Sequence, residues 1–431
     1  MKLNRREFLR AMTISTAGAA VWGVNPAFSP ASAWAMPSGD IRYLIKIFFT
    51  GGADALAWTP YDLPSVRARR PNIAEPSSSF INVGHEYVKL SGRLADLYTN
   101  WGDHMAIFPG TVGEMGSSGS HAVARQNEAN GSSSSDGQSV MGRMLVEIAR
   151  SEPSPFLGWT FSSTDAFHLA SRTLTPVVAP ADLSSYSFLP YDLKGLGGNK
   201  FKGAALQQAK LQILYQTHLM GGTLETAAVP ATTAGHATKS AFSALHGSLD
   251  AVRKAQQDHG IRSVQYPNTD FGRQLKSVAT LLDAGMGRCF YLPAPGAHDT
   301  HQGQRVNVGR YQEQFSAGLN AFLGDLAATG NLDRTVIMCI GEFGRQITEN
   351  SSGGTDHGRG QSAFLIGGRI VGGLYGPIAT EDEVSTGHAM PTKFSQRNFG
   401  FEIAQKMGLD PDIILPNRNF VRAPTGCWRQ A

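Results

Sequence analysis

Gly-Glu-Phe-Gly-Arg (residues 341–345) and Gly-Gly-Thr-Asp-His-Gly-Arg-Gly (353–360) are the most informative segments of this chain. They follow the apolar run Thr335–Ile340, which has the composition of a buried strand. A strand that ends in an acid, followed by an Asp-His pair between glycines, places candidate metal ligands at the carboxyl edge of a sheet. Open α/β sheets bind their ligands at that edge, and carboxylate plus imidazole suits a divalent ion such as zinc.

The rest of the chain extends this pattern of strands and helices in both directions. Further strands are predicted at Ile41–Phe49, at Cys289–Leu292, at Ser362–Ile366, and at Met105–Phe108 with a stop at Pro109-Gly110. An amphipathic helix is predicted at Arg310–Ala328. Strands separated by helices favour a three-layer α/β/α fold with a mostly parallel central sheet. We expect one domain over residues 36–431, with an irregular or helical insertion around 150–260.

The N-terminus has the features of an export signal. Asn4-Arg5-Arg6-Glu7-Phe8-Leu9 is a twin-arginine pattern, an uncharged stretch runs from Ala11 to Val24, and Ala33-Trp34-Ala35 is a cleavage site. A membrane anchor or an ordinary secretory signal is the alternative, but a span needs about 20 apolar residues. We therefore predict a signal peptide at 1–35, the twin-arginine translocase as a partner during export, a periplasmic location, and no span in the mature chain.

Charge and cysteine content narrow the function classes. The net charge is +4, and the first 35 residues hold four basic side chains and one acid, which leaves the mature chain near +1. A nearly neutral chain lacks the basic field that nucleic acid requires. The three cysteines form no Cys-x-x-Cys pattern, which argues against an iron–sulfur or cysteine–zinc site.

Two polar segments come directly after predicted strands. Asp54 follows the first strand behind two glycines, and His298-Asp299-Thr300-His301 follows the strand at 289–292. Placement at strand ends favours metal binding by Asp54, Asp299 and His301. The alternatives are a turn aspartate at position 54 and a solvated polar loop at 298–301.

The segment at 341–360 adds an acid, an Asp-His pair and two arginines. Glu342, Asp356 and His357 are candidate ligands, and Arg345 and Arg359 are candidates for clamping an anionic group. Structural ion pairs with Glu342 or Asp356 are the alternative for either arginine.

A fourth candidate group precedes a predicted helix. Ser120 and His121 follow a Gly/Ser-rich loop, at a helix start where free backbone N–H groups favour anions. Ser120 is a candidate nucleophile, activated by a metal or by His121. The alternative is that these serines only cap the helix.

Through these segments the chain resembles the bacterial family catalogued as domain of unknown function 1501, which is grouped with alkaline phosphatase- and sulfatase-like proteins. The resemblance rests on FFTGGADALAWTPY (48–61), Ser120-His121, HDTHQGQ (298–304), GEFGR (341–345) and GGTDHGRGQSAFLIGGRIVGGLYG (353–376). It implies metal ions held by Asp, Glu and His beside a Ser or Thr nucleophile. On this pattern Asp54 matches the first-strand ligand, Ser120 lies near the nucleophile's place, and His388 is a weaker candidate ligand. Relatives often carry Phe or Trp where this chain has His298.

The sequence therefore predicts an exported, metal-dependent hydrolase of phosphate or sulfate esters, acting on a small or anionic ester. Its metal would be zinc first, with manganese, magnesium or calcium as alternatives. The predicted metal ligands are Asp54, Asp299, His301, Glu342, Asp356 and His357, and the predicted catalytic residues are Ser120, His121, Arg345 and Arg359. A non-catalytic metal- or ligand-binding protein is the main alternative. An oxidoreductase is disfavoured because no Gly-x-Gly-x-x-Gly loop follows a strand.

Overall fold

The computed structural model describes residues 39–114, 119–131, 137–152, 154, 156–171, 176–178, 264–416 and 420–429. Backbone contacts divide the chain into two units, and the larger one holds Ala35–Leu183, Arg262–Asp283 and Gly287–Ala431. The predicted signal peptide and most of the predicted insertion around 150–260 lie outside the described residues. The central sheet and the predicted site residues all belong to the larger unit.

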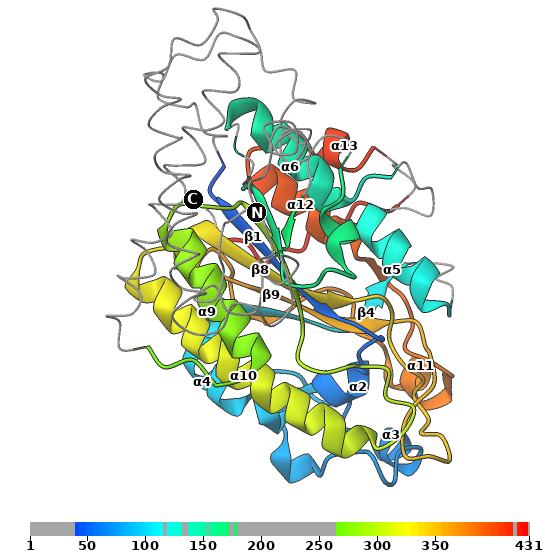
Figure 1. The fold of residues 1–431 in the computed structure, drawn as a ribbon. Coiled ribbons are helices and arrows are strands. Elements are labelled where there is room, and N and C mark those ends of the chain that lie inside the picture. The colour runs from blue at the N-terminus through cyan, green and yellow to red at the C-terminus, as the bar shows by residue number, and fades with distance from the viewer. Residues whose placement is uncertain are drawn as a thin grey trace, which may run out of the picture. The chain divides into compact units, whose positions relative to one another are not determined.

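A nine-stranded sheet forms the centre of the described part of the chain (Figure 1). Its strand order is β10-β4-β9-β8-β1-β7-β5-β6, and β11 also pairs with β4. The strands are β1 (Tyr43–Phe49), β4 (Met105–Gly113), β5 (Gly158–Thr160), β6 (Val177–Val178), β7 (Cys289–Pro293), β8 (Thr335–Gly341), β9 (Gln361–Ile366), β10 (Gly373–Leu374) and β11 (Phe394–Ser395). A separate hairpin joins β2 (Ile81–Asn82) to β3 (Lys89–Leu90).

The sheet is mostly parallel, as the sequence predicted. β1 runs parallel to both β7 and β8, and β9 is antiparallel to its neighbours β8 and β4. Every residue of β1, β4, β8 and β9 is buried, which explains their nearly continuous apolar sequences. Strands β1, β4, β7 and β8 therefore end at one edge of the sheet, and β9 starts there.

Helices cover both faces of the sheet, which confirms the predicted α/β class (Figure 1). On one side α10 (Gln304–Ala328) packs against α9 (Asp270–Asp283) and α4 (Ala95–Trp101). On the other side α13 (Pro411–Ile414) contacts α12 (Arg397–Lys406) and α6 (Val140–Ser151), and α6 contacts α5 (His121–Asn130). The remaining α-helices of the described residues are α2 (Ala55–Trp58), α3 (Pro64–Ala68) and α11 (Glu381–Thr386). Short 3-10 turns are η1 (Ser77–Ser79), η2 (Gly92–Leu94), η3 (Gly102–His104), η4 (Ala166–Leu169) and η6 (Leu332–Arg334).

Strand β4 differs from the prediction that Pro109-Gly110 would end it. The strand continues to Gly113, and its register with β9 shifts between Phe108 and Val112. Such a bulge accommodates a proline, which has no N–H to donate, and Gly110 has a φ of +72°. The strand consequently carries the chain farther toward the edge where the other strands end.

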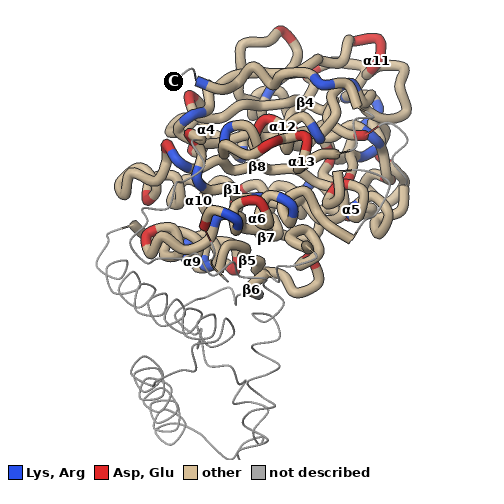
Figure 2. Tube along the Cα trace, turned by 90° about the horizontal axis from the view of Figure 1, so that it is seen from above, with Lys and Arg blue, Asp and Glu red and all other residues tan. Residues whose placement is uncertain are grey.

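Most acidic and basic residues lie on the helices and loops, with the two signs interspersed (Figure 2). Within the described ranges, every helix is too short or too polar to cross a bilayer.

Candidate metal centre

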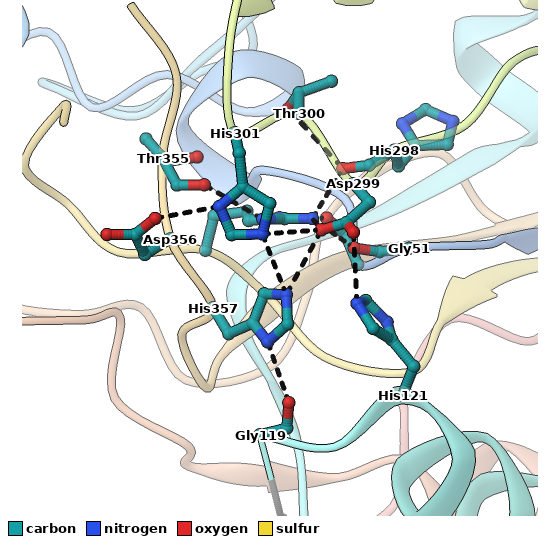
Figure 3. A network of polar contacts seen from close by, with 12 residues as sticks. Gly51, Gly119, His121, His298, Asp299, Thr300, His301, Thr355, Asp356 and His357 are labelled. Atoms are coloured by element: carbon teal, nitrogen blue, oxygen red, sulfur yellow. Dashed lines mark hydrogen bonds and ion pairs between the residues drawn. The ribbon is translucent and has the colours of Figure 1, made fainter. Parts of the chain in front are cut away.

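Four segments meet where β1, β4, β7 and β8 end (Figure 3). They are the turn after β1, the loop after β7, the loop between β8 and β9, and the start of α5. Together they gather seven of the predicted site residues: His121, Asp299, His301, Glu342, Arg345, Asp356 and His357. Gly354 allows this approach, because a Cβ at this position would overlap the His301 backbone.

Three imidazole rings direct their Nε2 atoms at the Asp299 carboxylate. His121 Nε2 is 3.3 Å from Oδ2, while His301 Nε2 and His357 Nε2 are 3.1 and 3.2 Å from Oδ1. The Nε2 atoms of His301 and His357 are themselves 3.2 Å apart. The side chains are only partly covered, with Asp299 40% exposed, so the cluster is open to water.

The opposite nitrogen of each ring faces a hydrogen-bond acceptor. Nδ1 of His121 is 2.8 Å from Glu342 Oε1, Nδ1 of His301 is 2.8 Å from Asp356 Oδ1, and Nδ1 of His357 is 2.8 Å from the Gly119 carbonyl oxygen. These contacts assign a proton to each Nδ1 and leave the Nε2 lone pairs facing inward. Histidines that bind metals are oriented in this way.

The inward lone pairs and the carboxylate repel one another, and a cation between them would relieve this repulsion. Arg345 supplies part of that positive charge, because it pairs with Asp299 and its Nη1 lies 3.5 Å from His301 Nε2. Nε2 of His121 is buried and has no hydrogen-bond partner among the described residues. Ligand atoms around a tetrahedral ion with bonds of about 2.0–2.1 Å lie about 3.3 Å apart, close to the spacing observed here. In the described part of the chain, His121, Asp299 and His357 form a group that could hold a metal ion.

Glu342 and Asp356 contact the Nδ1 atoms of His121 and His301, on the side of each ring that faces away from Asp299. The sequence predicted both acids as metal ligands. Glu342 is buried, and its Oε1 accepts hydrogen bonds from Gly51 N at 2.9 Å and from His121. Burial raises the pKa of Glu342, although the His121 and Gly51 hydrogen bonds oppose this effect. The hydrogen bonds from His301 and Asn350 lower the pKa of Asp356. Both acids orient histidines of the cluster, because each accepts a hydrogen bond from the Nδ1 of one ring.

Arg345 holds the loops together, which corrects the prediction that it clamps an anionic substrate. It is 1% exposed, and its guanidinium donates to the carbonyl oxygens of Gly52 (2.9 Å), Thr355 (2.9 Å) and His298 (3.0 Å) and to that of Gly51. It also pairs with Asp299. Burial alone would raise the pKa of Asp299, but the pairing with Arg345 lowers it. With its donors committed to the protein, Arg345 has little capacity left for a ligand.

Arg359 contrasts with Arg345. It is exposed, and none of the side-chain hydrogen bonds or ion pairs among the described residues involves it. It follows His357 by two residues in the loop between β8 and β9.

Asp54 does not join the cluster, contrary to the prediction. Its buried carboxylate pairs with Arg70, accepts from the side-chain amide of Gln304, and caps α2 through Leu56 N at 3.1 Å. Gln304 Oε1 in turn accepts from Thr300 Oγ1 at 3.1 Å and from Thr355 Oγ1 at 2.6 Å. Thr300 lies between Asp299 and His301, and Thr355 precedes Asp356. Through Gln304, Asp54 is therefore linked to the loop after β7 and to the loop between β8 and β9, which both carry residues of the cluster.

Two other predicted residues occupy different surroundings. Ser120 is exposed at the start of α5, and its side chain makes no capping hydrogen bond to that helix. His388 is exposed after α11, where its carbonyl accepts from Ile347 N at 3.0 Å. Ser120 directly precedes His121 of the cluster, whereas the side chain of His388 lies outside the cluster.

The side chain of His298 packs among buried aromatic rings. Its ring is 1% exposed and lies 5.1 Å from Phe49, 5.8 Å from Trp58 and 5.4 Å from Tyr311. Among the described residues neither ring nitrogen makes a hydrogen bond of normal geometry, and burial lowers the pKa of His298 to about 3 although a weak contact with the Pro295 backbone opposes this.

We expect H298F to raise the free energy of unfolding by about 1 kcal/mol, because it removes buried nitrogens that lack partners. Urea unfolding followed by tryptophan fluorescence measures the change. H298A is the matched variant and should lower stability by leaving a cavity. A lower midpoint for H298F than for wild type would contradict this explanation.

Fold and cluster together define an α/β protein with a candidate metal centre at the carboxyl edge of its sheet. Residues 203–419, half of the chain, match the family described as "Protein of unknown function (DUF1501)". The chain belongs to this family. No curated protein matches the chain.

Proposed function

We propose that this protein is an exported, metal-dependent hydrolase of phosphate or sulfate esters. The observation that carries the proposal is the convergence of three Nε2 atoms on Asp299, each ring oriented by an acceptor at Nδ1. Zinc fits best, because imidazole and carboxylate at this spacing suit a tetrahedral or five-coordinate ion. His121, Asp299, His301 and His357 would hold the ion.

The chain's own residues supply the other requirements of ester hydrolysis. A bound divalent ion would lower the pKa of a water or hydroxyl and polarise the ester oxygens. Ser120, exposed beside His121, is the proposed nucleophile. Arg359, exposed and unpaired among the described residues, is proposed to bind the anionic group and offset its developing charge. Arg345, Glu342 and Asp356 hold the ligands in place.

Export through the twin-arginine pathway into the periplasm is part of this proposal. It is supported by the motif at Arg5-Arg6 and by the cleavage site at Ala33-Trp34-Ala35. A protein that acquires a metal ion while folding is suited to transport in the folded state.

The direct test uses the full chain expressed with its leader and recovered from the periplasm. Its N-terminus reports cleavage after Ala35, and elemental analysis reports bound metal. Turnover of nitrophenyl phosphate, bis-nitrophenyl phosphate and nitrophenyl sulfate is then measured. We expect chelator-sensitive turnover of at least one ester and a loss of about 100-fold or more in S120A, because a nucleophile is removed. Wild-type protein that binds metal but turns over none of the three esters would contradict the hydrolase proposal.

A non-catalytic metal- or ligand-binding protein is the second candidate. One observation favours it: four side chains of this chain face the centre, and structural zinc sites are closed by four protein ligands. Metal content without turnover supports this candidate, and chelator-sensitive turnover excludes it.

A further inference from the structure

Helix α5 carries His121 into the cluster, but few apolar contacts hold the helix in place. Its buried residues are Ala124, Glu128, Ala129 and Asn130, so the only apolar side chains among them are two methyl groups. His121 and Glu128 are seven residues apart and therefore share one face of the helix, about 10.5 Å apart along its axis. Glu128 is a buried acid on the same face as His121, and a buried charge is stable only when an opposite charge is paired with it.

That partner is Lys46, the one charged residue of β1. Lys46 is 3% exposed, and its Nζ donates to both oxygens of Glu128, at 2.7 and 2.5 Å. Nζ also lies 3.2 Å from Nδ1 of His168, whose ring is 1% exposed and stacks on Tyr291 of β7 at 4.5 Å. A lysine in an otherwise apolar strand is costly to bury, and this one is fully paired.

A second charged contact fixes the same face of α5. Arg125, one turn after His121, pairs with Asp165, which directly precedes η4, and lies 5.4 Å above the ring of Phe167. The helix is thus attached to the sheet and to η4 mainly through charges. Ion pairs of defined geometry set the rotation and axial position of a helix, whereas alanine contacts tolerate small shifts.

We propose that Lys46 and Glu128 are positioning residues, which set α5 so that His121 faces Asp299 and completes the metal centre. This inference rests on the metal binding of the proposed function. Lys46 touches neither ligand nor ion, and it acts through Glu128 and the helix. A small rotation of α5 would carry Nε2 of His121 away from Asp299.

The test is the double variant K46M/E128M, which removes both charges without leaving one buried alone and should therefore fold. The matched control is R288M/E152M. It removes the ion pair between the buried Arg288 and the partly exposed Glu152, joined at 2.8 Å beside the start of β7, at the sheet edge opposite the cluster. Co²⁺ is titrated into each metal-free protein, and affinity and d–d absorption are recorded. H121A is then combined with each background.

We expect K46M/E128M to bind Co²⁺ about tenfold or more weakly than wild type, with an altered spectrum, while R288M/E152M keeps wild-type values. If the pair acts through His121, H121A weakens binding much less in the K46M/E128M background than in wild type. Additive losses, or unchanged affinity in K46M/E128M, would overturn the inference. Failure of wild-type protein to bind any divalent ion would instead count against the metal centre itself.

Discussion

The variant H357A is expected to be purified without bound metal. His357 supplies one of the three inward Nε2 atoms and lies 3.2 Å from both Asp299 Oδ1 and His301 Nε2. Loss of an outer partner of a metal ligand commonly costs 10–100-fold in affinity, so loss of a ligand should cost at least about 100-fold. Elemental analysis and a chelator competition measure this change.

The control for H357A is H388A. His388 is an exposed histidine whose side chain is outside the cluster, so H388A should retain wild-type metal content. Circular dichroism of both variants verifies that the fold is intact. Equal metal content in H357A and H388A would show that His357 is not part of a metal centre.

The second large effect is expected in the variant R345M. This change removes the guanidinium donor from the carbonyl groups of Gly51, Gly52 and Thr355 and leaves Asp299 without its guanidinium partner, while the His298 carbonyl still accepts from Thr300 N at 2.8 Å. The charge of Asp299, which is 40% exposed, is screened by water, whereas each buried carbonyl that loses its donor costs about 1–3 kcal/mol. We expect a loss of that size in the free energy of unfolding, measured with urea.

Arg359 provides the matched comparison in the same loop. Because its side chain is exposed, R359M should change stability by no more than about 0.5 kcal/mol. It should instead weaken inhibition by inorganic phosphate or sulfate, since the proposed anion contact is lost. A stable R345M, or an R359M that unfolds as readily as R345M, would show that the two arginines have been assigned the wrong roles.

The sequence was sufficient to predict the sheet and the edge where the candidate site lies. Buried strands have unbroken apolar runs, and Thr335–Ile340 and Cys289–Leu292 lie within β8 and β7. Acids and histidines directly after such runs must come to one edge of a parallel sheet, as Asp299, His301 and Glu342 do. The antiparallel direction of β9 was not predicted, because a six-residue, mostly apolar sequence is compatible with either pairing direction.

The order of side chains around the centre was harder to predict. Glu342 and Asp356 are as acidic as Asp299, and only the fold shows that each lies behind a histidine. Asp54 was misplaced because Arg70, its partner, is 16 residues away and belongs to no recognisable motif. Lys46 and Glu128 are 82 residues apart, so their pairing likewise leaves no local signal.

The antiparallel course of β9 has a consequence for how this family can diversify. Residues 342–360 leave the sheet at the end of β8 and return on the adjacent strand, so both attachment points of this loop lie side by side. A crossover to a parallel strand would instead need about a dozen or more residues only to travel back along the sheet. Insertions or exchanges in this loop can therefore reshape the entrance above the histidines while the strand scaffold beneath stays the same.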